Sequence, residues 1–478
     1  GIWHPSTAAT AHFCIVGATG SGKTISIRLL MQSVLSRINK CRGQRALVYD
    51  GKQDMLSILY GMGLDADIVL LNPFDVRSAA WDIAADITTP AAAQEIASIL
   101  IPEDKNTTQP FFPDSGRHLL TKTIEFLIRR LPGSWTLRDA LLIAKSTSLL
   151  RRVLTETPGN SELLDYFRSE TTGANILSTI HTKFQRYEFI AAMWEHAETK
   201  FSLEKWLTSE SILVLGNDET TRSALDAINQ VIFHRLSKLL IGLPESNTTQ
   251  NWIFLDEVRE AGRLEGLSSL LTKGRSKGVS VILGFQDIEG LHEVYGTKVA
   301  NELTGQCGNK AILKLNSPET AKWASSLFRE REVFECRESK SHVSAKHGGS
   351  SGVTTSEQLV NRKLILDSQF LQLPATTEEN GLCGYYISPY LGAYRTKLSG
   401  EWIKKSLKPS DSRVPNSIAR PSTQQELKPW GDEDFERVGL ALKNQSSKRG
   451  KRLKKYKLEK TAVKPEIKRK KIMKVGVS

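Results

Sequence analysis

The stretch GATGSGKT, residues 17–24, restricts the fold of this 478-residue chain more than any other feature. It follows a short apolar run at residues 12–16 and precedes apolar residues at helical spacing. Glycines let backbone N–H groups turn toward an anion, and the N-terminus of the following helix adds the positive end of its dipole. This strand–loop–helix pattern is typical of a phosphate-binding P-loop. The phosphate-binding residues that it predicts are Gly17, Ala18, Thr19, Gly20, Ser21, Gly22, Lys23 and Thr24.

Further apolar, β-rich runs predict the rest of a sheet. They lie at residues 45–50, 211–216, 251–256, 279–285 and 309–315, with helical spacing between them. A strand, a glycine-rich turn, a helix and a second strand are the opening of a parallel sheet in an α/β fold. We therefore expect a mainly parallel sheet with helices packed on it.

Residues 76–207 have a different texture, because helical periodicity dominates and β-branched runs are few. We interpret them as an inserted all-α domain, which divides the sheet domain into residues 1–75 and 208–402. One helix is expected over residues 136–154. The Ser/Gly-rich residues 339–356 predict a loop or hairpin of low order.

The net charge of +13 is concentrated in a tail. From residue 404 onward there are 22 Lys and Arg against 8 Asp and Glu, and the preceding residues are almost neutral. We expect residues 403–478 to be a disordered basic tail, because its charges repel one another. Such a tail suits nucleic acid or an acidic membrane surface, and a merely solubilising role is the alternative.

A second acidic motif supplies the chemistry that a P-loop needs. The apolar strand at residues 251–255 ends in Asp256 and Glu257, at the edge where open parallel sheets bind ligands. Lys23 would reach the β- and γ-phosphates, while Thr24 and Asp256 would hold Mg²⁺. Glu257 would act on the attacking water as a general base. The structural alternative is that Asp256 starts a helix and Glu257 is solvated.

Three further residues are candidates on weaker signals. Gln286 ends the next apolar strand, so we expect it beside Asp256, where it would sense the γ-phosphate or orient water. Asp50 ends another strand and either lines the same crevice or starts a turn. Arg275 lies in a basic loop, offset from that crevice, and either contacts the nucleotide of a neighbouring subunit or is a surface residue.

Together these segments resemble the TraD/TrwB-type coupling proteins of conjugative type IV secretion, within the FtsK/HerA group of ring-forming DNA motors. The resemblance covers about residues 10–400. Its specific parts are NPFDVRSAAWD at 72–82, GRSKG at 274–278 and GFQDIEGLHEVYG at 284–296. The P-loop, RALVYDGKQD at 45–54, ILVLGND at 212–218 and IFLDE at 253–257 support it.

The resemblance implies a RecA-like P-loop NTPase domain with an inserted all-α domain. It implies a hexameric ring with ATP and Mg²⁺ between subunits, in which Lys23, Thr24, Asp256 and Glu257 match the Walker positions. Arg275 would be the arginine finger and Gln286 the sensor. The ring would be a DNA-translocating ATPase that moves single-stranded DNA, or the relaxase bound to it, to the secretion channel. Relaxosome proteins and channel components would be its partners.

The sequence departs from the family in three respects. No run of about 18 apolar residues is present, so we expect this chain to lack the transmembrane segments that are common in the family. We expect a cytoplasmic location at the face of the inner membrane, with at most peripheral membrane contact. Asp50-Gly-Lys52 replaces a common Asp-Pro-Lys-Gly, and the basic tail differs from the acidic tail of some relatives. The alternatives are a HerA/FtsK-like pump for double-stranded DNA and a nucleotide-gated platform that recruits protein without translocation.

Overall fold

A nine-stranded sheet forms the centre of the computed structural model, which describes residues 10–40, 42–103, 109–157, 159–218, 220–343 and 350–440. Within these residues the strand order is β13-β12-β9-β1-β8-β7-β2-β6-β3. The strands are β1 (Phe13–Val16), β2 (Arg45–Asp50), β3 (Asp67–Leu71), β6 (Ser211–Gly216), β7 (Ser246–Leu255), β8 (Lys277–Phe285), β9 (Asn309–Ile312), β12 (Leu382–Ser388) and β13 (Gly392–Leu398).

The sheet is parallel from β9 to β3, and only β12 and β13 run antiparallel to their neighbours. The predicted mainly parallel sheet is therefore confirmed. Strand β8 lies between the P-loop strand β1 and the acidic strand β7. This order brings the carboxyl ends of all three strands to one edge, where parallel sheets bind ligands.

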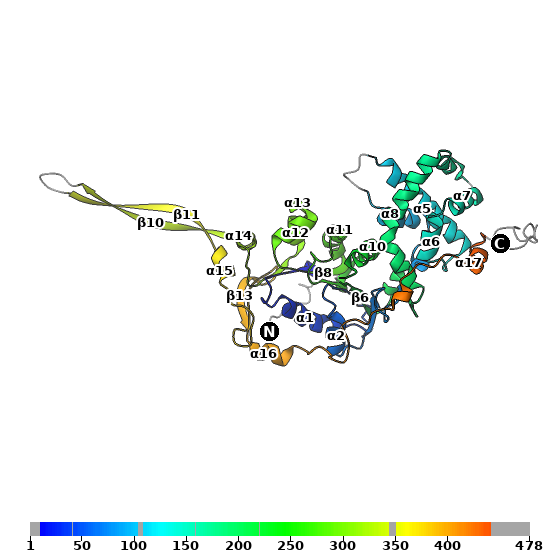
Figure 1. Cartoon of the computed structure of the whole chain (residues 1–478). Coiled ribbons are helices and arrows are strands. Elements are labelled where there is room, and N and C mark those ends of the chain that lie inside the picture. The colour runs from blue at the N-terminus through cyan, green and yellow to red at the C-terminus, as the bar shows by residue number, and fades with distance from the viewer. Residues whose placement is uncertain are drawn as a thin grey trace, which may run out of the picture. The chain divides into compact units, whose positions relative to one another are not determined.

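Helices cover both faces of the sheet (Figure 1). On one face α1 and α2 pack against Val48, Phe254 and Ile282, and these side chains belong to one buried core. Helices α10 to α13 cover the other face. The helices of this part are α1 (Lys23–Leu35), α2 (Met55–Gly61), α10 (Arg222–Ile241), α11 (Leu267–Lys273), α12 (Ile288–Tyr295), α13 (Thr297–Gln306), α14 (Pro318–Ser326), α15 (Asp367–Leu371) and α16 (Gly400–Ser406).

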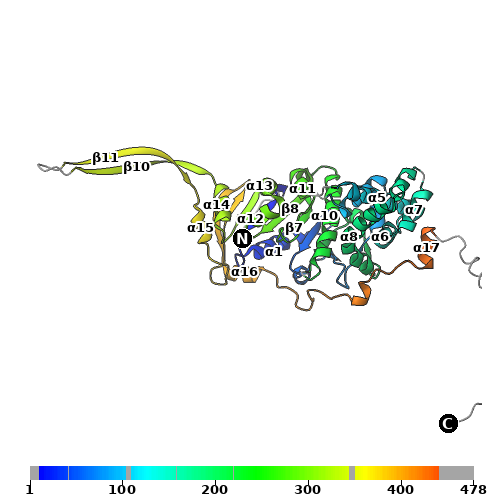
Figure 2. The same cartoon turned by 45° about the horizontal axis from the view of Figure 1, so that its top comes forward.

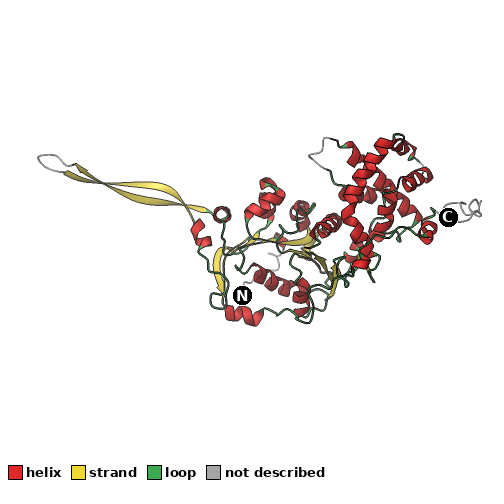
Figure 3. Ribbon diagram, in the orientation of Figure 1, coloured by secondary structure: helices red, strands yellow, loops and turns green. Residues whose placement is uncertain are grey.

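Between β3 and β6 the chain is mostly helical, and these helices gather at one end of the sheet (Figure 3). They are α3 (Ile83–Asp86), α4 (Pro90–Leu100), α5 (Phe111–Arg130), α6 (Leu137–Ala144), α7 (Thr147–Glu156), α8 (Glu170–Trp194) and α9 (Leu203–Trp206). A short parallel pair, β4 (Ala80–Trp81) and β5 (Lys200–Phe201), flanks them. No helix of the described residues is long and apolar enough to cross a membrane.

The single helix expected over residues 136–154 is wrong. The chain forms α6 and α7 there, separated at Lys145 and Ser146. The Ser146 hydroxyl accepts a hydrogen bond from the backbone N–H of Leu149, so it starts a new helix. Because serine is a strong N-cap, it interrupts an apolar periodicity that otherwise continues.

A long two-stranded ribbon leaves the sheet domain after α14. Strands β10 (Glu330–Val343) and β11 (Ser350–Lys363) pair antiparallel over their whole length. Figures 1 and 2 show the ribbon extending away from the sheet in both views. Of the residues 339–356 that were expected to form a loop or hairpin, 339–343 and 350–356 belong to these paired strands, and 344–349 lie outside the described residues. The paired strands are much longer than expected.

The disordered tail expected from residue 403 is wrong for residues 403–428. The segment after α16, residues 407–428, lies on the domain as a strap. Arg28 donates a hydrogen bond to the Lys408 carbonyl, and the Asp411 N–H donates to the Ser57 carbonyl. Arg420 is buried and donates to the Pro73 carbonyl at 2.8 Å. Hydrogen bonds to residues far away in the sequence hold this proline-rich segment in place.

The chain divides into two compact units at residue 428. The second unit begins at Pro429 and contains α17 (Asp432–Val438), in which Trp430 and Phe435 make an edge-to-face ring contact. Residues 441–478, which include the densest basic stretch, lie outside the described residues.

Candidate active site at the P-loop

The P-loop is fixed at the carboxyl ends of β8 and β9. The Gly17 N–H donates to the Phe285 carbonyl at 3.2 Å, and the Ala18 N–H donates to the Lys314 carbonyl at 2.9 Å. Gly20 and Gly22 have φ of 76° and 93°, a left-handed conformation that favours glycine. These contacts hold the predicted strand–loop–helix geometry, and α1 begins at Lys23.

The loop has the features of an anion cradle. Within the described residues, the backbone N–H groups of Thr19, Gly20 and Gly22 donate no hydrogen bond. The Ser21 hydroxyl oxygen and Oδ1 of Asp256 are buried without a hydrogen-bond partner among the same residues. Buried polar groups normally have partners. These N–H donors, together with the Ser21 hydroxyl and the Asp256 carboxylate, lie at one edge of the sheet. This combination of groups fits a nucleotide phosphate with its magnesium ion.

Three charged groups meet beside the loop. Lys23, which is 6% exposed, donates from Nζ to Glu257 Oε2 and lies 3.6 Å from Asp256 Oδ1. The Thr24 hydroxyl donates to Asp256 Oδ2 at 3.2 Å. Because Asp256 and Glu257 are each 4% exposed, the lysine ammonium compensates two buried carboxylates.

Glu257 has an unusual backbone for a non-glycine residue. Its φ is 67°. Such a left-handed conformation costs a non-glycine residue on the order of 1 kcal/mol, and residues that adopt it are often found at functional sites. Gln286 donates from Nε2 to Glu257 Oε2 at 3.0 Å, and the Thr19 hydroxyl lies 3.4 Å from Gln286 Oε1. The expected closeness of Gln286 to the acidic pair is therefore observed, because β7 and β8 are neighbours.

Arg275 is the predicted site residue that does not join this group. It lies in a short 3₁₀ turn (Gly274–Ser276) before β8, whereas Gln286 follows the other end of that strand. Nine residues of parallel strand separate these ends by about 30 Å. We call residues 273–277, with Lys273, Arg275 and Lys277, the arginine loop. In the described part of the chain, Arg275 is exposed and has no ion-pair or hydrogen-bond partner.

Asp50 has a local structural role. Its carboxylate accepts hydrogen bonds from the backbone N–H groups of Lys52, Asp54 and Met55 at 3.2–3.3 Å. Burial, followed by the nearby charge of Asp54, raises the pKa of Asp50 to about 6. Of the two alternatives for Asp50, the turn that leads into α2 is the one observed.

Thr376 is a contact that the sequence analysis missed. It lies between α15 and β12, about 350 residues beyond the P-loop. Its N–H donates to the Gly20 carbonyl at 2.9 Å and its hydroxyl to the Ser21 carbonyl at 2.7 Å. Both bonds orient P-loop peptides. No local pattern marks this threonine, since its role depends on tertiary structure alone.

His12 is a second missed residue, and it is buried below the arginine loop. Its Nδ1 accepts a hydrogen bond from the Val281 N–H, and Nε2 lies 3.1 Å from the Leu271 carbonyl. Burial, together with the nearby charge of Arg275, lowers the pKa of His12 to about 4, although the hydrogen bond to the Leu271 carbonyl acts in the opposite direction. The neutral ring therefore ties β8 to α11, just before the arginine loop.

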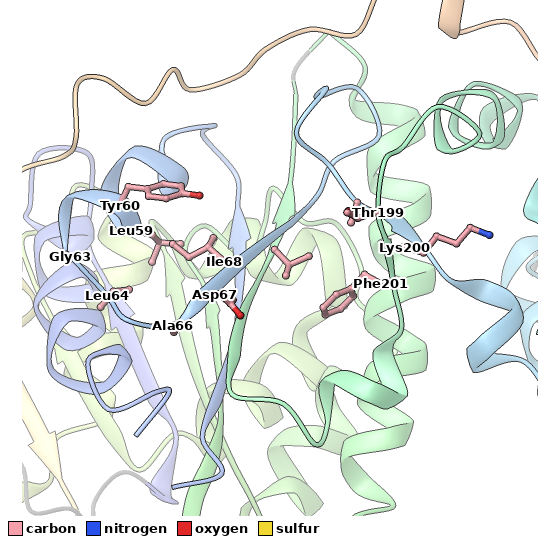
Figure 4. A pocket seen from close by; sticks show the side chains of 12 residues that line it. Leu59, Tyr60, Gly63, Leu64, Ala66, Asp67, Ile68, Thr199, Lys200 and Phe201 are labelled. Carbon is pink, nitrogen blue, oxygen red and sulfur yellow. The ribbon is translucent and has the colours of Figure 1, made fainter. Parts of the chain in front are cut away.

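A separate pocket lies away from the P-loop. It has a volume of about 540 Å³ and is lined by the end of α2, by β3 and by residues 199–201, without any P-loop residue (Figure 4). Among the described residues no cluster of three or more His, Cys, Asp or Glu is placed to hold a metal. Magnesium at phosphate sites commonly takes only one or two protein carboxylates, together with phosphate and water.

The sequence of residues 1–381 matches a family described as the type IV secretion-system coupling protein DNA-binding domain. Coupling protein TraD of Escherichia coli (strain K12) is 24% identical over 408 residues, which cover 83% of this chain and 55% of TraD. The chain therefore spans about half the length of this curated relative.

Solved structures of TrwB share the fold. The bacterial conjugative coupling protein TrwBdeltaN70, in an unbound monoclinic form, has a TM-score of 0.66 and 22% identity, covering 87% of this chain and 89% of that one. The plasmid coupling protein TrwB in complex with ADP and Mg²⁺ also has a TM-score of 0.66 and 22% identity, over 88% and 91% of the two chains. This likeness confirms the α/β RecA-like architecture.

Proposed function

Because the chain belongs to the family of type IV secretion-system coupling proteins, we propose that it is an ATPase that moves DNA in conjugative transfer. The cargo would be single-stranded DNA, alone or bound to a relaxase, and the destination a secretion channel. One observation carries the proposal: Lys23, Asp256, Glu257 and Gln286 meet at the carboxyl edge of the sheet.

The P-loop would bind the phosphates of ATP. The free N–H groups of Thr19, Gly20 and Gly22 and the dipole of α1 favour an anion. Thr24 and Asp256 would hold Mg²⁺, which would neutralise charge on the β- and γ-phosphates. Phosphate oxygens compete with Glu257 for the Lys23 ammonium, so nucleotide binding would open that ion pair.

Opening the ion pair would leave the Glu257 carboxylate able to accept a proton from water. The left-handed backbone at Glu257 aims this carboxylate into the site, and Gln286 donates to it. Glu257 would then act as general base, while Gln286 would orient the water or sense the γ-phosphate. The TrwB structure in complex with ADP and Mg²⁺ supports the choice of a nucleotide and magnesium as ligands.

Arg275 would complete the site of a neighbouring subunit. A separation of about 30 Å along β8 keeps it from the P-loop of its own chain. An exposed arginine inserted from a neighbour stabilises the charge of the transferring phosphoryl group. This arrangement requires a ring of like subunits, and the proposed number is six.

DNA would be bound through its phosphates, so that contacts are independent of sequence and weakened by salt. The description of the matching family as a DNA-binding domain supports this choice of substrate. The basic residues after 440 would add contacts to DNA or to acidic lipid. The proposed place of work is the cytoplasmic face of the inner membrane, beside relaxosome and channel proteins.

ATP hydrolysis by the full chain tests the proposal. Turnover would be measured without DNA and with single- or double-stranded DNA, and light scattering would give the mass with and without nucleotide. We expect single-stranded DNA to increase turnover several-fold, together with assembly of the chain. The Glu257→Gln variant is the matched control, since it keeps shape and hydrogen bonding but lacks the base.

Other outcomes would select the alternatives. Greater stimulation and translocation on double-stranded DNA would indicate a HerA/FtsK-like pump. ATP binding without DNA-stimulated turnover would indicate a recruitment platform and would contradict the motor.

A further inference from the structure

The β10–β11 ribbon is an exposed element that the nucleotide site does not use. Its strands have 14 residues each, so it is about 45 Å long. Phe334, Leu359 and Val353 are 71%, 53% and 59% exposed. An isolated two-stranded ribbon is marginally stable in water, and an exposed apolar patch usually marks a contact.

The charge of the ribbon does not suit nucleic acid. Its two strands contain five acidic and five basic residues. A DNA-binding arm needs an excess of positive charge to displace counterions. The partner that fits a neutral ribbon with exposed apolar side chains is a protein.

The antiparallel register separates the charges of the ribbon onto two faces. Directly paired residues share a face, and faces alternate along each strand. One face, which we call the acidic face, carries Glu330, Glu332, Glu338 and Glu357, and by register also Lys363 at its base and Lys340 toward its tip. The opposite face, which we call the arginine face, carries Arg331, Arg337 and Arg362, with Glu335 between them.

Each face also has an apolar centre at the same level of the ribbon. On the acidic face Phe334 pairs with Leu359, and on the arginine face Val333 pairs with Val360. Arg337 and Arg362 are both in ion pairs with Glu335, whereas Arg331 has no ion-pair partner in the described part of the chain. Glu330, Glu332 and Glu338 have none there either. Each face therefore keeps an excess of one sign of charge: three arginines against one glutamate on the arginine face, and a majority of glutamates on the acidic face.

We propose that the acidic face of one ribbon packs on the arginine face of the ribbon of a second copy of this chain. Stacked sheets lie about 10 Å apart, so Phe334 and Leu359 would meet Val333 and Val360 of the next copy. The flanking glutamates would meet the flanking arginines. Two apolar centres at one level and opposite charges around them make the faces complementary.

This contact is head-to-tail. Packing the acidic face on itself would oppose glutamates, and packing the arginine face on itself would oppose arginines. A contact between two different surfaces repeats from copy to copy and closes into a ring or continues as a filament. The ribbon therefore acts as an assembly element, separate from the nucleotide site.

Charge reversal on each face tests the contact in the full chain. One variant combines Glu332→Lys with Glu338→Lys, and the other combines Arg331→Glu with Arg337→Glu. Sedimentation over a concentration series should show self-association weakened at least tenfold in each. An equal mixture of the two variants should restore self-association. When the two variants alternate, each positively charged face meets a negatively charged face of the next chain. Circular dichroism and the unfolding temperature of each variant would report intact folding.

Disulfide trapping measures the same contact directly. Cys336 is exposed on the acidic face, and Ser356 lies at the same level on the arginine face. With Cys41 replaced by serine, Ser356→Cys should give a ladder of cross-linked chains on mild oxidation. Adding Cys336→Ser should abolish the ladder.

Three results would overturn the proposal. The first is unchanged self-association of both charge-reversal variants, and the second is no recovery of self-association in their mixture. The third is a cross-linked dimer formed through Cys336 alone, because it would show that two acidic faces pack on each other. A loss of DNA affinity with unchanged association would assign the ribbon to DNA instead. ATP turnover of the Arg275 and Glu257 variants tests the proposed nucleotide site, which is a different contact. A negative result there would therefore not decide whether the ribbons pack on one another.

Discussion

The P-loop edge and the arginine loop are both rich in charge but differ in how that charge is compensated. At the P-loop edge, Lys23 is buried and paired with Asp256 and Glu257 of the same chain. In the arginine loop, Lys273, Arg275 and Lys277 have no ion-pair partner within the described residues. Both regions are connected to β8, one at each end.

The difference follows from the cost of burying charge. A buried ion requires a partner, so the P-loop edge must be complete within each chain for the chain to fold. An exposed cluster of like charges gains no stability from its own chain. We infer that the arginine loop is kept for a contact outside the chain, and the following predictions test that contrast.

The largest effect is expected for Lys23→Ala. It removes the only cation paired with Asp256 and Glu257 in the described structure and the group proposed to bind the phosphates. We expect ATP turnover to fall about 1000-fold. The free energy of unfolding should decrease by about 3 kcal/mol, because two carboxylates remain buried without a cation. Phosphate release and thermal unfolding would measure both effects.

Lys40→Ala is the matched control, since Lys40 pairs with Asp65 on the surface. It should change neither quantity appreciably. Normal ATP turnover in Lys23→Ala would remove the assignment of the site.

The second effect concerns the arginine loop. We expect Arg275→Ala to reduce turnover at least 100-fold and to leave ATP affinity and unfolding temperature almost unchanged, since the side chain is exposed. Mixing Arg275→Ala with Glu257→Gln should restore part of the activity, at interfaces that combine an intact Glu257 with an intact Arg275. Steady-state turnover as a function of mixing ratio measures this.

Lys273→Ala serves as the control, because it removes a neighbouring positive charge of the same loop. If no ratio of the two variants recovers activity, Arg275 does not act between chains.

The third effect concerns His12, which lies between the two regions. Its pKa is about 4 in the folded protein and 6.5 ordinarily, so the unfolded chain binds the extra proton first as the pH falls. Stability should therefore decrease from about pH 6.5 to pH 4, by about 3 kcal/mol in total. His12→Gln keeps one donor and one acceptor and should flatten this part of the stability profile.

Thermal unfolding of both proteins at closely spaced pH values would measure the difference. His181→Gln, on the exposed side of α8, is the control and should keep the slope. An identical slope in His12→Gln would show that another group is responsible.

The smallest effect is expected for Thr376→Val. The substitution keeps the shape but removes the hydroxyl that donates to the Ser21 carbonyl. Losing one hydrogen bond costs about 1 kcal/mol, so nucleotide affinity should weaken about fivefold. Titration with a fluorescent nucleotide would measure it. Thr377→Val, one residue further along, is the control, and equal affinities of both variants would exclude an effect on the P-loop.

The sequence predicted the P-loop edge well because its information is local. A glycine pattern, a strand and two acids at its end place Lys23, Asp256 and Glu257 together as soon as the strand order is parallel. Strands 45–50 and 211–216 were predicted at their observed bounds, because they are fully buried apolar runs. The roles of these residues in catalysis stay predictions.

Other elements depend on contacts that a local pattern does not contain. The strap was mistaken for a disordered tail because its order comes from partners more than 300 residues away, such as Asp75, which accepts from the Ile418 N–H. Most of the ribbon was missed because neither of its faces is buried, so it lacks the apolar alternation of a strand. Strand β3 was missed although Ile68, Val69 and Leu70 are apolar.

The strap also limits how the first unit can deform. It is fastened to α1 through Gln32, which accepts from the Lys408 N–H, and to the other end of the sheet at Asp75 and Arg420. At its far end Arg138 of α6 donates to the Lys428 carbonyl. The strap has a limited length between these hydrogen bonds. A large movement of α6 away from α1 would therefore break some of them. A large displacement of α6 that keeps these hydrogen bonds must move both helices together as a single body.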